Sequence, residues 1–177
     1  MTRRFALPLA LAWALLLAPA APAATSGGTD VRPTSKPAAP AGSKGKVTSA
    51  GLALAPANAP ARVKAIIAAG NRIATKPYRY GGGHGRWIDS GYDCSGSVSF
   101  ALRGARLLSS PLASGGFISW GKRGRGTWVT IRANGGHMYM VVAGLRFDTS
   151  AHKRGGSRWT AQMRSARGYV GRHPAGL

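Results

Sequence analysis

The chain has a single cysteine, Cys94, and only four acidic residues among 177, all of them aspartate. A lone thiol excludes an intramolecular disulfide and a cysteine-rich zinc site, and so few acids exclude a carboxylate cage for a metal. The absence of glutamate also argues against glycoside hydrolysis, which uses a pair of carboxylic acids. Because acids are scarce, each of the three beyond residue 60 is conspicuous: Asp89, Asp93 and Asp148.

Long apolar runs are also scarce, and the one at residues 5–17 follows a basic start. This run is too short to span a bilayer comfortably, and Ala-Pro-Ala at residues 21–23 offers small residues for cleavage. We therefore predict a signal peptide at residues 1–23, with an uncleaved anchor as the alternative. An exported protein with one thiol has it as half of an intermolecular bridge, as a bystander, or for its chemistry.

Residues 24–59 lack the aromatic and branched side chains that bury enough surface to offset the entropy of the chain. Their Ala, Pro, Gly, Ser and Thr composition predicts a flexible tether. Residues 60–177 are long enough for one domain with a single core.

Positive charge dominates, with 25 Lys and Arg against four acids and a formal net charge of +21. Such a surface attracts polyanions. No nucleic-acid-binding motif is present, so we expect no specific nucleic-acid partner. An exported protein meets anionic wall polymers and lipid head groups first, and we expect the basic surface to bind the wall polymers. The alternative is a charge that serves solubility and nonspecific adhesion.

Two helices are expected from apolar periodicity. One covers residues 61–75, between Pro60 and Pro77, and the other begins at Cys94 with an apolar face at Val98, Ala101, Leu102 and Ala105. A helix start favours a thiolate because unpaired amides and the positive end of the dipole lie there. The alternative is a small buried cysteine under the helix start.

Glycine is concentrated at residues 81–85, Gly-Gly-Gly-His-Gly, which must form a loop. The loop lacks the Gly-Lys-Ser/Thr ending of a nucleotide-binding loop. We expect a close backbone approach to a substrate or to a neighbouring segment instead.

A strand at residues 127–133 and a hairpin with strands at 137–142 and 145–148 are predicted next. If the hairpin connection has an even number of residues, His137 and Asp148 emerge on the same face, directly or diagonally opposed. An activated thiol needs an imidazole base and an acceptor that orients it. The alternatives are a structural histidine and a turn carboxylate, and the other histidines are interpreted as surface or rim residues: His84, His152 and His173.

Three motifs together resemble the NlpC/P60 peptidases, bacterial enzymes of papain-like topology that cleave peptidoglycan stem peptides. They are Pro-Tyr-Arg-Tyr-Gly-Gly at residues 77–82, Tyr-Asp-Cys-Ser-Gly at 92–96, and Gly-His at 136–137. The resemblance covers about residues 60–177 and implies an α+β, papain-like catalytic domain, with helices packed on a small antiparallel sheet and the nucleophile at a helix N-terminus. The Gly-Asp-Leu turn typical of the family before the histidine is missing, which indicates a divergent branch.

Carried over by position, the resemblance implies a cysteine peptidase. With the predicted signal peptide we expect it to be secreted or wall-associated, and we expect a monomer that needs no metal or cofactor. Cys94 would be the nucleophile and His137 the base, with Asp148 where relatives more often have His, Asn or Gln. Tyr78 would lie near the oxyanion, or be a core aromatic. Asp93 and Ser95 would contact the free amino end of the stem peptide, although Asp93 could simply cap the helix. Alternative functions are a related amidase or acyltransferase and a noncatalytic wall-binding module.

Overall fold

Residues 44–177, without the side chains of 153–155, are described by the computed structural model and form an α+β structure. They belong to one unit, Ser35–Leu177. The predicted signal peptide and residues 24–43 of the predicted tether lie outside the described residues. The elements are β1 (Lys46–Val47), β2 (Ala53–Leu54), α1 (Ala61–Arg72), α2 (Cys94–Gly104), α3 (Ser114–Phe117), β3 (Lys122–Arg123), β4 (Val129–Ala133), β5 (Met138–Val142), β6 (Leu145–Phe147), α4 (Thr149–Gly155), β7 (Trp159–Thr160) and β8 (Val170–His173).

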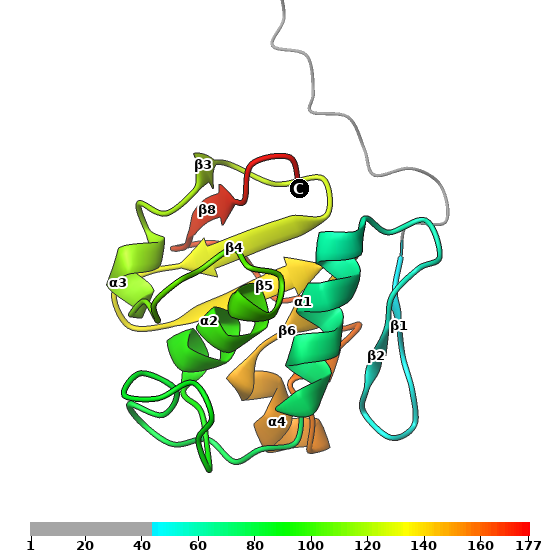
Figure 1. The fold of residues 1–177 in the computed structure, drawn as a ribbon, viewed down its shortest axis with the longest axis horizontal. Helices are drawn as coiled ribbons and strands as arrows, with labels where there is room; N and C mark the ends of the chain where they lie inside the picture. Colours follow the sequence, from blue (N-terminus) through cyan, green and yellow to red (C-terminus); the bar gives the residue numbers. More distant parts are fainter. Residues whose placement is uncertain (1–43) are drawn as a thin grey trace, which may run out of the picture. The chain divides into compact units, whose positions relative to one another are not determined.

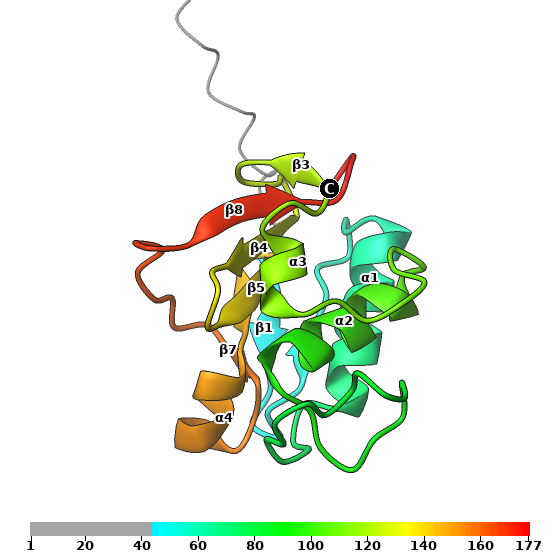
Figure 2. The ribbon, with the colours of Figure 1, turned by 90° about the vertical axis from the view of Figure 1, so that its left-hand side faces the viewer.

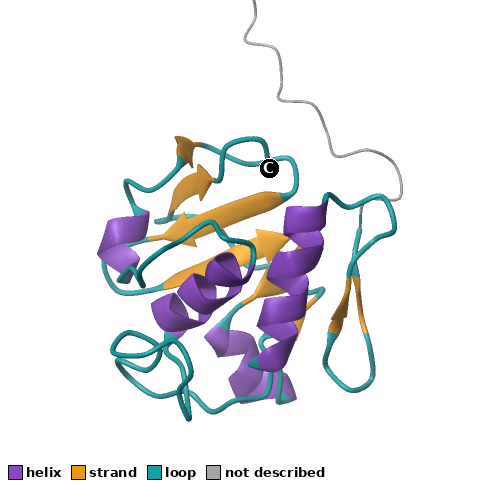
Figure 3. Ribbon diagram, viewed as in Figure 1, coloured by secondary structure: helices purple, strands orange, loops and turns teal. Residues whose placement is uncertain are grey.

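Six strands form one antiparallel sheet in the order β3-β8-β4-β5-β6-β7. Helices α1 and α2 lie against the same face of this sheet, and their buried side chains form the core with those of β4 and β5 (Figures 1 and 2). Residues 73–93, which join the two helices, contain no helix or strand (Figure 3). None of the described helices has the length and apolar character needed to cross a membrane.

Helices α1 and α2 confirm the two helices expected from apolar periodicity. The predicted face of α2 is buried, and α1 buries Val63, Ile66 and Ile67. The two helices approach closely at Gly104, where an added Cβ would lie 2.3 Å from the Cβ of Ala69. Because a contact this short is a clash, only glycine at this position permits the observed packing of α2 on α1.

The β5–β6 hairpin has the even connection on which the sequence prediction depends. Val142 pairs with Leu145, and the two residues between them have positive φ values of 47° and 74°, as tight hairpin turns require. Continued by one pair, this register sets Asp148 opposite Tyr139. His137, two residues before Tyr139, then lies diagonal to Asp148 on the same face, which confirms the prediction.

Residues 44–59 differ from the predicted tether, because they form the β1–β2 hairpin and pack against α1. The Asn71 side chain donates to the Ala53 carbonyl and accepts from the Ala53 amide, both at 2.9 Å. Ala53 and Ala59 are buried in the common core. Composition predicts that this segment cannot bury a core of its own, but it needs none because it uses the surface of α1.

Candidate active site

Cys94 is the first residue of α2 and lines an open pocket of about 410 Å³. Its Sγ lies 3.6 Å from Ser114 Oγ at the start of α3. The other walls come from the 73–93 segment, from the residues beside the cysteine and from the turn before β5, and include Tyr78, His84, Asp93, Ser95 and Gly136. The thiol is therefore half-buried but reachable from solvent, unlike a cysteine sealed under a helix start.

Several contacts favour the thiolate form of Cys94. Burial by itself raises the pKa of the thiol, but hydrogen bonds from His137, Ser114 and the Met138 backbone amide outweigh it. The pKa is therefore lowered from its ordinary value of 9.0. The start of α2 acts in the same direction, because its unpaired amides favour a negative charge.

His137 connects the thiol to a carboxylate. Its Nε2 lies 3.1 Å from Asp148 Oδ1, and the imidazole also hydrogen-bonds to Cys94. The hydrogen bond to Asp148 is the main cause that raises the pKa of His137 to about 9, and the bond to Cys94 adds to it. The three side chains thus favour a thiolate beside an imidazolium.

Asp148 is a fully buried carboxylate surrounded by donors and cations. Burial raises its pKa, but hydrogen bonds from His137 and from the Ser150 backbone amide lower it by more, so the pKa falls well below its usual range. Arg164 Nη1 lies 3.2 Å and Arg146 Nε 3.7 Å from Oδ2. Asp148 therefore stays ionised, and it both caps α4 and fixes the His137 ring.

Arg164 is a partner of Asp148 that sequence reasoning missed. Its guanidinium lies 5.4 Å from the ring centroids of both Tyr139 and Tyr169. Arg164 belongs to residues 161–169, which contain no helix or strand, so no periodicity in the sequence could connect it to Asp148.

Asp93 is held by four donors, which confirms its interpretation as a helix cap. Its Oδ1 accepts from the Gly96 amide at 2.7 Å and from the Ser95 hydroxyl at 3.2 Å. Its Oδ2 accepts from the Gly81 amide, and His84 Nε2 lies 3.1 Å from Oδ1. The contact with a substrate amine that the resemblance implies for Asp93 and Ser95 stays a prediction, since both residues line the pocket.

His84 lines this pocket, which agrees with the surface or rim position expected from the sequence. Its Nε2 is 3.1 Å from Ser95 Oγ as well as from Asp93. His152 and His173 contact backbone carbonyl groups elsewhere, those of Thr75 and Gly124 respectively. The clue to His84 in the sequence is its place in a glycine-rich loop close before the cysteine.

The glycine-rich loop packs its backbone on the first turn of α2. A Cβ on Gly96 would lie 2.0 Å from the Gly82 carbonyl oxygen, and Gly81 and Gly83 have φ values of 72° and 84°. The Asp93 amide donates to that same carbonyl. This confirms the expected close approach to a neighbouring segment, which fixes the rim of the pocket beside Cys94.

Arg158, a second arginine that sequence reasoning missed, holds the 73–93 segment against α2. It is fully buried, and it donates to the Ser97 hydroxyl and to the carbonyl groups of Ile73, Ala74, Lys76, Pro77 and Tyr92. Burial lowers its pKa to about 10, so it remains a cation. It ties both ends of the 73–93 segment to α2.

Tyr78 lies in the pocket with 46% of its surface exposed, so it is not a core aromatic. Burial and, after it, the negative charges of Cys94 and Asp93 raise the pKa of its hydroxyl. The hydroxyl therefore stays protonated and can donate a hydrogen bond near the thiol.

Together these elements define an α+β protein with a Cys–His–Asp contact chain whose cysteine lines an open pocket. Within residues 44–177, no three His, Cys, Asp or Glu side chains gather as a metal site would need. Comparisons of the chain with models of protein families, with curated proteins and with solved structures find no match.

Proposed function

We propose that the protein is a secreted cysteine hydrolase that cleaves amide bonds in peptidoglycan stem peptides. The observation that carries the proposal is the chain of contacts from Cys94 through His137 to Asp148, which lowers the pKa of the thiol and raises that of the imidazole. A bystander cysteine has no need of such partners, and a thiolate beside an imidazolium is the resting pair of a cysteine nucleophile.

Acyl transfer follows from this geometry. The Cys94 thiolate attacks the amide carbonyl carbon, and the electron pair of the C=O bond moves onto oxygen. As that oxygen re-forms the carbonyl, the C–N bond breaks, and the His137 imidazolium gives its proton to the leaving amine. Neutral His137 then takes a proton from water, whose oxygen attacks the thioester and releases the acid and the thiolate.

The oxyanion of this reaction has donors at the start of α2. The Asp93 side chain accepts a hydrogen bond from the Gly96 amide, and the Asp93 backbone carbonyl accepts one from the Ser97 amide. The amides of Cys94 and Ser95 have no hydrogen-bond partner among residues 44–177 and point along the positive end of the helix dipole. The protonated Tyr78 hydroxyl is a third donor in the same pocket.

The order of the elements supports the papain-like, NlpC/P60-type part of the proposal. A helix that begins with the cysteine precedes an antiparallel hairpin that supplies the histidine and its carboxylate. The substrate class comes from the same resemblance. The net charge of +21 adds electrostatic attraction to anionic wall polymers, which salt weakens.

The test is digestion of purified peptidoglycan by the full-length chain and by its Cys94→Ala variant, with mass spectrometry of the fragments. The proposal expects shortened stem peptides from the wild type and none from the variant. His152→Ala is the matched control, because His152 lies outside the pocket. Undiminished cleavage by Cys94→Ala would refute the nucleophile. Products that carry a transferred acyl group would indicate an acyltransferase, and sedimentation with sacculi without any product would indicate a binding module.

A further inference from the structure

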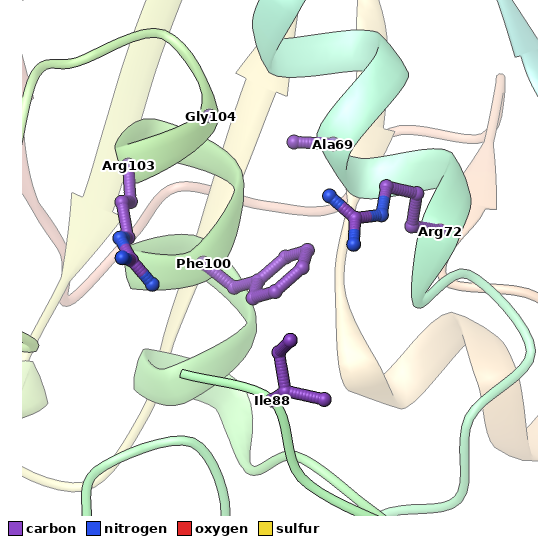
Figure 4. A pocket seen from close by; sticks show the side chains of 6 residues that line it. All are labelled: Ala69, Arg72, Ile88, Phe100, Arg103 and Gly104. Carbon is purple, nitrogen blue, oxygen red and sulfur yellow. The ribbon is translucent and has the colours of Figure 1, made fainter. Parts of the chain in front are cut away.

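A second hollow, of about 250 Å³, lies between α1, α2 and the 73–93 segment (Figure 4). Its lining comprises Ala69, Arg72, Ile88, Phe100, Arg103 and Gly104, and it shares no residue with the pocket at Cys94. Phe100 lies between the two arginines, while Ile88 extends from the loop with 74% of its surface exposed. The hollow thus combines two cations with an apolar floor.

The two arginines are oriented by aromatic rings. Arg103 Cζ lies 4.5 Å from the Trp87 ring centroid, and Arg72 Cζ lies 5.6 Å from that of Phe100. A guanidinium held over an aromatic ring keeps its N–H donors for other partners, and a planar or tetrahedral anion can accept two of them. These side chains are therefore arranged before any ligand arrives.

Neither arginine is neutralised by the protein. Among the residues that the structure describes, the side chains of Arg72 and Arg103 form no hydrogen bond and no ion pair. Asp89, the acid next to Ile88, is bonded to Arg79 at 2.9 Å and lies 3.8 Å from Arg86. Asp93 and Asp148 are held by the pairs described above. The positive potential at the hollow is thus left for a ligand.

We propose that this hollow binds a small phosphate ester. Its phosphate accepts hydrogen bonds from Arg72 and Arg103, and its organic group rests on Phe100 and Ile88. A phosphate suits two arginines better than a carboxylate does, because it carries more charge and has oxygens for two guanidinium forks. The volume lies below the ~300 Å³ at which drug-sized pockets begin, so the organic group is small.

The experiment is a titration of the full-length, ¹⁵N-labelled chain with phenyl phosphate, inorganic phosphate and phenol, followed by amide chemical shifts at physiological ionic strength. Phenyl phosphate should shift the amides of Ile88, Phe100 and Arg103 in a saturable way. It should bind at least ~10-fold more tightly than inorganic phosphate, which lacks the apolar part. Phenol should bind more weakly still, because it lacks the anion.

Charge-matched variants separate this site from general attraction to a basic protein. The double variant Arg72→Gln/Arg103→Gln should weaken phenyl phosphate binding by at least ~10-fold, whereas Arg123→Gln/Arg125→Gln, exposed residues at β3, should change it by less than ~3-fold. Equal losses in both pairs, or saturable shifts that avoid the hollow, would overturn the proposal. Exposure of all four arginines keeps the fold intact in these variants, and the wild-type shift map tests the site without any substitution.

Discussion

Two histidine–aspartate pairs meet near Cys94, and in each the histidine Nε2 lies 3.1 Å from the carboxylate Oδ1. Both carboxylates also cap a helix: Asp93 caps α2 and Asp148 caps α4. The pairs differ in their other partners. His137 contacts the thiol, whereas His84 contacts the Ser95 hydroxyl. The distance between imidazole and carboxylate therefore does not show which histidine is the base for Cys94. The contact between the imidazole and the sulfur does.

The two carboxylates also differ in the charges around them. Asp148 is beside two arginines as well as His137, while Asp93 is held mainly by neutral amide and hydroxyl groups. Neutral donors suit a group that holds a loop on a helix. Cations suit a buried carboxylate that must remain ionised beside a histidine that changes its protonation state.

The largest expected difference between the pairs is in activity. His137→Ala should lower the release of peptidoglycan fragments by at least ~10³-fold, because it removes the group that delivers the proton. His84→Ala should lower it by less than ~10-fold, since Asp93 keeps three other donors. Initial rates of fragment release measure both. A greater loss in His84→Ala than in His137→Ala would reverse the roles assigned to the two pairs.

Removal of Arg158, the buried cation that holds the 73–93 segment with His84, should mainly affect the stability of the fold. Arg158→Met removes the donor to the Lys76 carbonyl and one of the two donors to each of the Ile73, Pro77 and Tyr92 carbonyls, at a cost of about 3 kcal/mol or more in the free energy of unfolding. Urea unfolding followed by circular dichroism measures this cost. The exposed Arg125→Met is the control and should change stability by less than ~0.5 kcal/mol. A cost for Arg158→Met no larger than the control's would contradict the supporting role of Arg158.

The His137–Asp148 pair should make stability depend on pH in a defined window. The folded pKa of His137, about 9, exceeds the ordinary 6.5, so its contribution is complete below pH 6.5 and is lost as the pH rises through 9. Asp148, whose folded pKa is lowered, contributes fully throughout this window. A Cys94→Ala background removes the opposing titration of the thiol and also its share in raising the His137 pKa, so the window then ends below pH 9. Across this narrower window the free energy of unfolding should fall by about 2 kcal/mol.

Denaturant unfolding of Cys94→Ala on both sides of the window provides the measurement. The double variant Cys94→Ala/Asp148→Asn is the matched control, and its stability should change much less because the main cause of the raised His137 pKa is gone. If the free energy of unfolding changed with pH in the same way in the two proteins, His137 and Asp148 would not be coupled as described.

A smaller effect is expected from Arg164, which touches Asp148 but not the thiol. Arg164→Met should lower the rate about 3- to 10-fold and move the alkaline limb of the pH–rate profile, which reports His137, to higher pH, because a cation beside the pair is lost. Arg164→Lys should restore the position of the limb in part. A lower rate with an unmoved limb would indicate a purely structural role.

The residues that sequence reasoning located are those with a regular local pattern. Apolar periodicity identified the helix that begins at Cys94, and strand alternation with an even turn set His137 and Asp148 on one face. These inferences need only the neighbours of each residue along the chain, and the structure agrees with each of them.

The residues that it missed lie far from their partners along the chain. Ser114, Arg158 and Arg164 reach the site from 20, 61 and 16 residues away from their partners Cys94, Ser97 and Asp148. No periodicity relates such positions. Residues 44–59 differ from the predicted tether for a related reason. Their burial depends on contacts with α1, including Asn71, and the composition of the segment itself gives no sign of these contacts.

The central claim, that His137 and not His84 activates Cys94, is tested most directly by the pH dependence of Cys94 alkylation with iodoacetamide. The single thiol makes this rate unambiguous. We expect a wild-type midpoint below 9.0, the same midpoint in His84→Ala, and a return toward 9.0 in His137→Ala. A wild-type midpoint at or above 9.0, or one that His137→Ala leaves unmoved, would contradict the account.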